Sequence, residues 1–212
     1  MNTPTPLPPF QSRVVPVVVV TDPAQAVPMA EALLAGGVDV IEITLRSAAG
    51  LAAIEAVAKA VPAMQVGAGT VTRASEVAQV LNAGARFALS PGSTPALIDA
   101  VLQARLPFIP GVGSPSEAMA MRDAGFTLMK CFPAAQLGGV EVLKAWGGPL
   151  PDLRFCPTGG VSLANMAQFL ALPNVAMVGG SWLTPAAAVQ AGDWAQITRL
   201  AREATLAAQA VA

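Results

Sequence analysis

Histidine is absent from this chain of 212 residues. Imidazole is the commonest side-chain metal ligand in proteins and the commonest general base near neutral pH. Its absence argues against a histidine-ligated metal centre and against catalysis that depends on a histidine base. If the protein is an enzyme, another group, such as a carboxylate, must carry its protons.

Charged residues are also scarce. They make up 12% of the chain, and the formal net charge is −1. The sequence contains no run of Lys and Arg that would favour binding to the phosphate backbone of nucleic acids or to an anionic membrane surface. We therefore expect no nucleic-acid partner.

Membrane-spanning runs, export signals and disulfide patterns are missing as well. Hydrophobic residues make up 54% of the chain, yet no uninterrupted apolar run reaches the roughly 18 to 20 residues that cross a bilayer. Residues 1–10 lack the basic and apolar regions of a signal peptide. The two cysteines, Cys131 and Cys156, are too few for a disulfide framework. We expect a cytoplasmic protein with no membrane partner and two reduced, buried thiols.

The length fits one large domain. Residues 1–13 form a Pro-rich lead-in for which no regular structure is predicted, and residues 14–212 are predicted to form the domain. A β-branched run opens it, as expected for a parallel strand covered on both faces. Strand-like and helix-like segments then alternate. The expected strands are 14–20, 38–46, 64–67, 86–89, 107–109, 126–130, 154–156 and 175–178. The first expected helix ends at 35, the next six span 50–60, 74–82, 95–104, 115–123, 139–145 and 163–170, and the last begins at 193.

Eight strands that alternate with helices at roughly 20 to 25 residues per unit predict a parallel α/β fold. Eight such units in about 200 residues favour a closed (β/α)8 TIM barrel over a doubly wound sheet. In barrel enzymes the reactive groups lie where the strands end and the following loops begin. The polar residues at these strand ends are therefore the candidates for an active site.

Lys130 is the first candidate, because it lies in the apolar run Phe126–Pro133 near the end of the sixth expected strand. A buried ammonium costs several kcal/mol unless it is paired or loses its proton. A neutral amine is the form that attacks a carbonyl to give a Schiff base. The alternative is a lysine that extends from the strand end to solvent.

The second expected strand carries two further candidates. Side chains alternate along a strand, so Glu42, Thr44 and Arg46 share one face. The apolar residues between them face the other way, toward covering helices. The carboxylate of Glu42 and the guanidinium of Arg46 lie at the same end of the barrel as Lys130. The competing interpretation is that Glu42 and Arg46 only pair with each other and have a structural role.

Glycine-rich turns follow several strands. The third strand ends at Gly69, where the backbone allows close approach and Thr70 offers a hydroxyl. Paired glycines follow the seventh and eighth strands, the positions that commonly bind phosphate in this barrel class. Residues 155–192 contain no charged side chain, so backbone N–H groups and helix dipoles are predicted to hold a phosphate there.

Five motifs together resemble the 2-keto-3-deoxy-6-phosphogluconate aldolase family, the class I aldolases of the Entner–Doudoroff pathway. They are VDVIEITLR at 38–46, VGAGTV at 66–71, SPG at 90–92, MKCFPA at 129–134 and RFCPTGGV at 154–161. The resemblance covers nearly the whole chain from Val14 onward. It implies a homotrimer with no metal and no other cofactor. The site residues that it implies are Lys130 for the Schiff base, Glu42 for proton transfer, Arg46 and Thr70 for the substrate carboxylate, and Gly159, Gly160, Gly180 and Ser181 for the phosphate.

The activity expected from this resemblance is cleavage of 2-dehydro-3-deoxy-6-phosphogluconate to pyruvate and glyceraldehyde 3-phosphate. Cleavage of 4-hydroxy-2-oxoglutarate needs the same lysine and glutamate but no phosphate site, and is expected as a side activity. A metal-dependent sugar-phosphate epimerase is disfavoured, since such sites usually need histidine. The alternative from another class is a non-catalytic phosphate-metabolite-binding barrel, in which Lys130 and Glu42 only pair.

Overall fold

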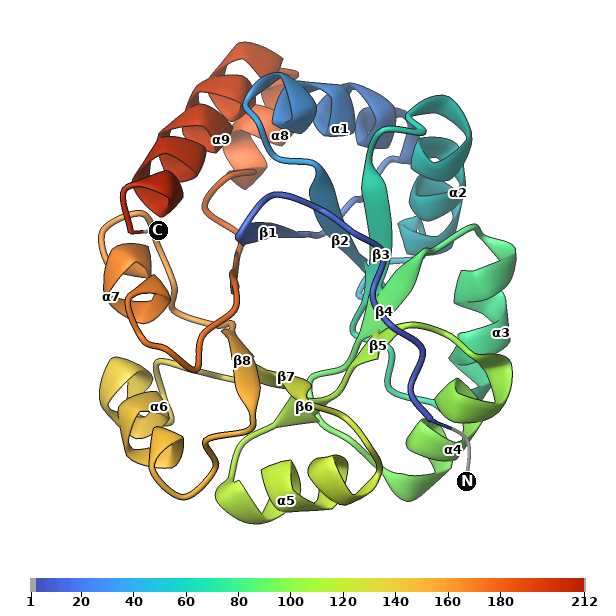
Figure 1. Ribbon diagram of the computed structural model, residues 1–212. Helices are drawn as coiled ribbons and strands as arrows, with labels where there is room; N and C mark the ends of the chain where they lie inside the picture. Colours follow the sequence, from blue (N-terminus) through green and yellow to red (C-terminus); the bar gives the residue numbers. More distant parts are fainter. Residues whose placement is uncertain (1–2, 212) are drawn as a thin grey trace.

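The computed structural model describes residues 3–211, in which an inner ring of parallel strands is surrounded by helices (Figure 1). The strands are β1 (Val14–Val18), β2 (Val40–Thr44), β3 (Gln65–Gly69), β4 (Phe87–Leu89), β5 (Phe108–Ile109), β6 (Gly111–Val112), β7 (Leu128–Cys131), β8 (Arg154–Pro157) and β9 (Val178–Gly180). The helices are η1 (Pro23–Gln25), α1 (Ala26–Ala35), α2 (Gly50–Ala60), α3 (Ala74–Asn82), α4 (Pro95–Ala104), α5 (Pro115–Asp123), α6 (Gly139–Gly147), α7 (Met166–Leu170), α8 (Ala186–Ala191) and α9 (Trp194–Gln209).

The strands pair in the order β5-β4-β3-β2-β1-β9 and β6-β7-β8, and every pairing is parallel. Isolated bridges between Phe155 and Val175 and between Thr158 and Gly179 join β8 to the β9 segment. On the opposite side, β5 and β6 are consecutive parts of one strand that link the two groups. The predicted (β/α)8 barrel is confirmed.

The expected eight strands correspond to nine strands within residues 3–211, because Pro110 divides the fifth strand into β5 and β6. Proline has no N–H to donate to a strand ladder. Its carbonyl still accepts a hydrogen bond from the Lys130 N–H at 2.8 Å, so the strand continues through the interruption.

The prediction was less accurate near the C-terminus. The last strand spans 178–180 instead of 175–178, because Val175 forms only an isolated bridge. The prediction also missed α8, whose C-cap is Gly192 with a φ of 66°. Asp193 then caps α9 by accepting a hydrogen bond from the Gln196 N–H at 2.9 Å.

The apolar residues form two separate clusters. The larger one lies between the strands and the helices and includes the outward-facing strand residues. The smaller one fills the barrel interior and contains Val15, Val40, Phe87, Leu89, Ile109, Cys156 and Met177. Alternation of side chains along the strands explains this division.

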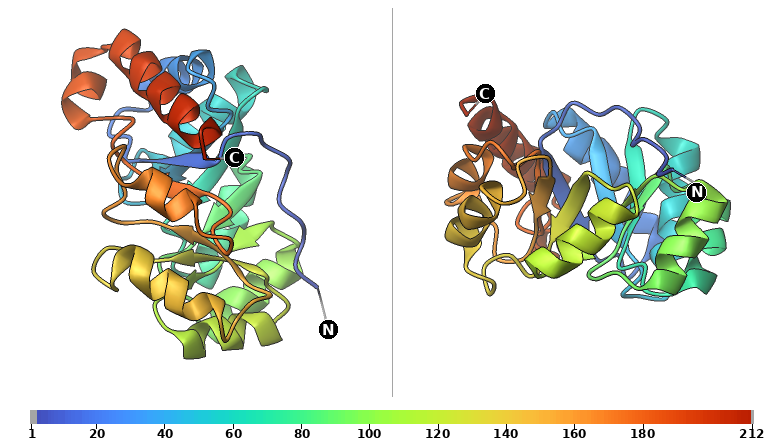
Figure 2. Two further views of the ribbon diagram at one scale, coloured as in Figure 1. Left: turned by 60° about the vertical axis from the view of Figure 1, so that its left-hand side comes forward. Right: turned by 60° about the horizontal axis from the view of Figure 1, so that its bottom comes forward.

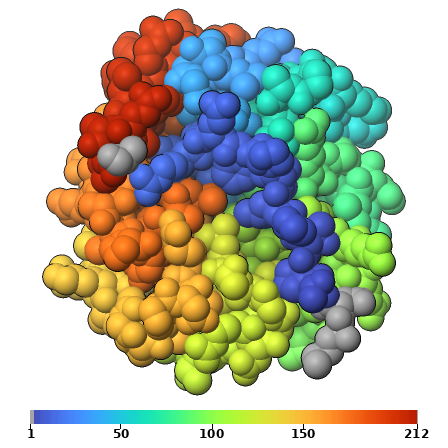
Figure 3. Space-filling view, in the orientation of Figure 1, coloured from blue at the N-terminus to red at the C-terminus, as the bar shows by residue number. Residues whose placement is uncertain are grey.

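The N-terminal segment, residues 3–13, contains no helix or strand and lies along the amino-terminal end of the barrel (Figure 2, Figure 3). Leu7 and Phe10 pack against the interior cluster, and the Phe10 and Phe87 ring centroids are 6.0 Å apart. The backbone N–H groups of Gln11 and Ser12 donate to the Asp39 carboxylate at 2.8 and 2.9 Å. The expected absence of regular structure is thus confirmed for the described part of the segment, although the segment is well packed.

No helix among residues 3–211 combines the length and the apolar character needed to cross a membrane.

Candidate active site

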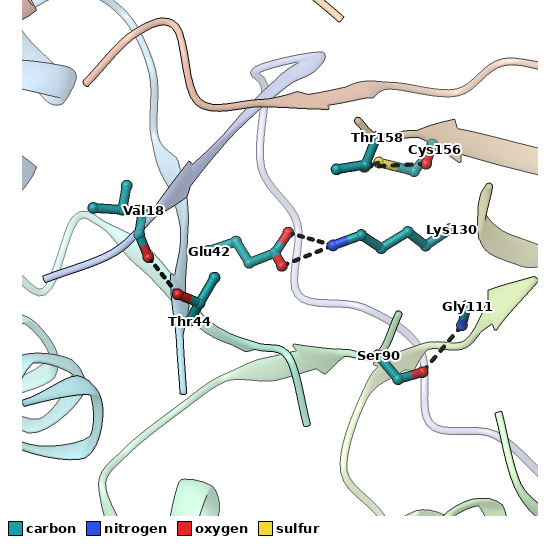
Figure 4. Close-up of polar contacts among 8 residues, drawn as sticks. All are labelled: Val18, Glu42, Thr44, Ser90, Gly111, Lys130, Cys156 and Thr158. Carbon is teal, nitrogen blue, oxygen red and sulfur yellow. Dashed lines mark hydrogen bonds and ion pairs between the residues drawn. The ribbon is translucent and has the colours of Figure 1, made fainter. Parts of the chain in front are cut away.

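Lys130 and Glu42 meet inside the barrel, each projecting from a strand on its own side (Figure 4). The Lys130 Nζ donates to Glu42 Oε1 at 2.8 Å and to Oε2 at 3.2 Å. The lysine is 4% exposed and the glutamate 1%, so the ion pair is almost fully removed from solvent. The structure therefore places an amine and a carboxylate within hydrogen-bonding distance of each other inside the barrel.

Strand alternation explains why both side chains point inward. On β2, Ile41 and Ile43 face the helices and Glu42 faces the interior. On β7, Met129 and Cys131 face the helices and Lys130 lies between them. A buried charge is tolerated when a partner and hydrogen bonds compensate it, and each member of this pair compensates the other.

Other side chains define the surroundings of the lysine. The Phe132 ring centroid lies 5.7 Å from Lys130 Nζ, within range of a cation–π contact. On the neighbouring strand, Cys156 is opposite Lys130 in register. Burial raises the pKa of the Cys156 thiol to about 12, so this thiol stays protonated at neutral pH and does not compete as a nucleophile.

A cavity of about 530 Å³ opens at the carboxyl end of the barrel. Its wall contains five of the predicted site residues: Arg46, Gly159, Gly160, Gly180 and Ser181. Lys130 and Glu42 are not part of this wall. Phe132 joins the two regions, because it lines the cavity and its ring lies near Lys130 Nζ.

The loop after β8 exposes backbone to this cavity. Gly159 and Gly160 have φ angles of 94° and 79°, a region that glycine adopts readily. At the end of β9, an added Cβ on Gly180 would overlap the Trp182 ring. Gly180 is therefore needed for packing whether or not it contacts a ligand.

Thr70 and Arg46 have different surroundings. Thr70 follows β3, is partly buried, has a φ of 59° and does not line the cavity. Arg46 lies in the turn after β2, and its side chain is exposed at the cavity wall. Alternation was expected to put Arg46 on the same face as Glu42, with a pairing between the two as the alternative. The strand ends at Thr44, however, and Glu42 pairs with Lys130.

Sequence reasoning missed the roles of two buried hydroxyls and one aromatic ring. Thr44 Oγ1 donates to the Val18 carbonyl at 2.9 Å, and Ser90 Oγ accepts from the Gly111 N–H at 3.0 Å (Figure 4). These bonds link β2 to β1 and the end of β4 to β6. Phe132 follows Lys130 by two positions, so alternation was a signal that could have placed its ring on the side of the amine.

Within the described residues, no group of three or more His, Cys, Asp or Glu side chains is arranged to hold a metal ion. The chemistry that the site itself offers is that of an amine, a carboxylate and a backbone-lined cavity. A barrel with a buried lysine–carboxylate pair next to such a cavity contains the functional groups of a lyase that works through a lysine imine.

Comparisons with known proteins agree with this class. A family model described as "KDPG and KHG aldolase" matches residues 10–200. This chain belongs to that aldolase family.

Its relatives include a 2-dehydro-3-deoxy-phosphogluconate aldolase of Pseudoalteromonas atlantica, 52% identical over 95% of this chain and 94% of the relative. A KHG/KDPG aldolase of Escherichia coli K12 is also 52% identical, over 90% of each chain. Among solved structures, KDPG aldolase of Legionella pneumophila, with pyruvate captured as a covalent carbinolamine, has a TM-score of 0.90 and 44% identity, covering 92% of this chain and 94% of that one.

Proposed function

We propose that this protein is a class I aldolase that cleaves 2-dehydro-3-deoxy-6-phosphogluconate to pyruvate and glyceraldehyde 3-phosphate. The observation that carries the proposal is the buried pair in which Lys130 Nζ lies 2.8 Å from Glu42 Oε1. The family relationship supports the choice of substrate, since relatives at 52% identity carry this activity in their names.

The reaction begins when the amine of Lys130 attacks the C2 carbonyl of the substrate. Glu42 accepts the proton that the ammonium must lose before it becomes a nucleophile. A carbinolamine forms, and Glu42 returns its proton to the carbinolamine oxygen, which leaves as water; the nitrogen becomes a protonated imine and Glu42 is again a carboxylate. Because Lys130 and Glu42 are shielded from solvent, the carboxylate remains close to the nitrogen throughout these steps.

The imine draws electrons from the C3–C4 bond. Glu42 removes the proton of the C4 hydroxyl as that bond breaks, which releases the aldehyde and leaves the enamine of pyruvate on Lys130. The carboxylic acid then returns a proton to C3. Hydrolysis of the resulting imine releases pyruvate and restores the amine.

We assign the ends of the substrate to separate parts of the site. The pyruvate carboxylate is bound by the Arg46 guanidinium and the Thr70 hydroxyl. The phosphate is bound mainly by backbone N–H groups, which suits a cavity wall with few cations. The phosphate-binding residues in this assignment are Gly159, Gly160, Gly180 and Ser181.

The proposal extends to assembly, location and a second substrate. We propose a homotrimer in the cytoplasm. The exposed hydrophobic side chains, which include Leu206 at 60% and Met119 at 46% exposure, support burial of part of the surface by neighbouring subunits. Cleavage of 4-hydroxy-2-oxoglutarate is proposed as a second activity, supported by the double name of the E. coli relative.

Borohydride reduction with pyruvate tests the central assignment. The chain has three lysines, Lys59, Lys130 and Lys144, so peptide mass spectrometry locates the reduced adduct without ambiguity. We expect the adduct on Lys130 alone, and none in Lys130→Arg, because a guanidinium stays protonated and forms no imine. A non-catalytic metabolite-binding barrel would acquire no adduct, and labelling of Lys59 or Lys144 would contradict the assignment.

A further inference from the structure

Gly69 lies at the end of β3, where the Glu42 side chain packs directly against its Cα. A Cβ added at position 69 would overlap Glu42 Oε1 and lie 2.5 Å from its Cγ and 2.7 Å from its Cδ. These separations are shorter than any normal contact with a Cβ atom. The carboxylate therefore occupies the space that any other residue at position 69 would fill.

The same oxygen has two close neighbours. Glu42 Oε1 is the atom nearest to the missing Cβ and is also the atom that accepts the 2.8 Å hydrogen bond from Lys130 Nζ. The carboxylate is thus held between the lysine and the backbone of β3. A displacement away from Gly69 changes its distance and direction to the amine.

Neither the Glu42 side chain nor the β3 backbone can move easily to make room for a Cβ at position 69. Glu42 is 1% exposed, so its carboxylate has no solvent-filled space to enter. The strand β3 pairs with β2 over five residues and with β4 on its other side, and the Gly69 carbonyl accepts a hydrogen bond from the Leu45 N–H at 2.9 Å. Moving the backbone would disturb both ladders.

We propose that Gly69 is a positioning residue for the aldolase reaction: its lack of a side chain creates the space that holds the Glu42 carboxylate against the amine of Lys130. This inference rests on the proposed role of Glu42. Gly69 has no side-chain functional group of its own to offer the reaction, and it acts through the position of the carboxylate.

Gly67 provides a matched control on the same strand. It lies two residues earlier, also faces inward, and its added Cβ would overlap the Phe87 ring instead of Glu42. Overpacking destabilises a well-packed interior, so Gly67→Ala and Gly69→Ala should both lower the melting temperature. Only the second should alter the carboxylate.

The measurement is hydrogen–deuterium exchange at the pyruvate methyl group, which needs both the lysine imine and the base. We expect Gly69→Ala to slow exchange at least tenfold while borohydride still traps pyruvate on Lys130. Gly67→Ala should trap pyruvate and exchange within about threefold of the wild-type rate. Equal loss of exchange in the two variants, or normal exchange in Gly69→Ala, would overturn the proposal.

A double variant keeps the test decisive if Gly69→Ala folds poorly. Glu42→Asp removes one methylene and so frees the space that a Cβ at position 69 needs. We expect Glu42→Asp to slow exchange in the wild-type background but to raise exchange, or recover folding, in the Gly69→Ala background. Independent effects, with the double variant at the product of the two single losses, would contradict direct contact.

The outcome for Glu42→Gln separates this inference from the proposed function. If Glu42→Gln exchanges at the wild-type rate, the role of Glu42 is wrong. If Glu42→Gln loses exchange and Gly69→Ala does not, the function stands and only the positioning role of Gly69 fails.

Discussion

The two ends of the barrel are built differently. At the amino-terminal end, Leu7 and Phe10 of the N-terminal segment close the interior over an apolar cluster that includes Phe87. At the carboxyl-terminal end, a cavity of about 530 Å³ is lined by glycine-rich loops and by a mixture of polar residues, such as Thr158 and Ser181, and apolar residues, such as Phe132. The Lys130–Glu42 pair lies inside the barrel, between the apolar cluster at the closed end and the cavity at the open end.

This difference assigns the stability of the fold mainly to one end of the barrel and ligand binding to the other. The closed amino-terminal end contributes buried apolar surface. It also keeps water from reaching the ion pair from that end, which strengthens the electrostatic interaction between Lys130 and Glu42. The open end leaves backbone N–H groups and hydroxyls available to a ligand. A substitution at the closed end should therefore change the free energy of unfolding, and one at the open end should change substrate affinity.

Phe10→Ala should have the largest effect on the closed end. Removing a fully buried Phe costs about 3 to 5 kcal/mol, and Phe10 is partly buried, so we expect a loss of about 2 to 3 kcal/mol in unfolding free energy. The kcat of the folded fraction should stay within about twofold of wild type. Urea denaturation checks the first value, with exposed Pro9→Ala as the control. A large fall in kcat at unchanged stability would contradict the separation of the two ends.

Ser181→Ala tests the open end. Ser181 is exposed, so loss of its hydroxyl should leave unfolding nearly unchanged. One hydrogen bond to a charged oxygen is worth about 1.5 to 3 kcal/mol, which corresponds to a rise of about 10- to 100-fold in KM for the phosphorylated substrate. Steady-state kinetics with 4-hydroxy-2-oxoglutarate, which has no phosphate, is the control. The same rise on both substrates would argue against a phosphate contact.

Within the described part of the chain, two non-glycine residues have a positive φ, and substituting them should have the smallest effect on stability. Thr70, at 59°, follows β3 at the open end, and Arg105, at 54°, is the C-cap of α4. A left-handed backbone costs a non-glycine residue about 1 to 2 kcal/mol, partly offset by the greater entropy of glycine when unfolded. Arg105→Gly should stabilise the protein by about 0.5 to 1 kcal/mol without changing kinetics.

Thr70→Gly relieves the same strain but should weaken pyruvate binding, because the proposed carboxylate contact is lost. Thermal unfolding and the pyruvate concentration needed for half-maximal borohydride trapping measure the two effects. A Thr70→Gly variant with unchanged trapping would remove Thr70 from the carboxylate site.

Most of the barrel could be predicted from the sequence because its strands are short β-branched or apolar runs between glycine-bounded helices. The details that could not be predicted depend on tertiary pairing. Pro110 interrupts a strand without ending it, because its carbonyl still joins the ladder. Phe10 belongs to a segment without periodicity, and its burial follows only from closure of the barrel.

The site was partly predictable for the same reason. Alternation indicated that Glu42 and Lys130 face inward, but it left open whether Glu42 pairs with Arg46, four residues away, or with Lys130. The observed partner lies 88 residues distant, and strand spacing alone does not indicate which side chains meet across a barrel. The contact between Gly69 and Glu42 could not be predicted from the sequence either, because the motif around Gly69 indicates only that some group approaches the backbone closely.

The central claim is that Glu42 moves protons in addition to pairing with Lys130. Stability alone does not test it: Glu42→Gln removes the charge partner of a buried ammonium and should destabilise the protein in either case. The amide keeps the shape of the side chain but cannot accept the proton.

The decisive measurement is the rate of deuterium exchange at the pyruvate methyl group in folded Glu42→Gln, alongside borohydride trapping. We predict that pyruvate is still trapped on Lys130 while exchange falls by about 10²- to 10⁴-fold, the usual contribution of a positioned acid–base group. Exchange at the wild-type rate with trapping intact would mean that another group moves the proton, and would contradict the account.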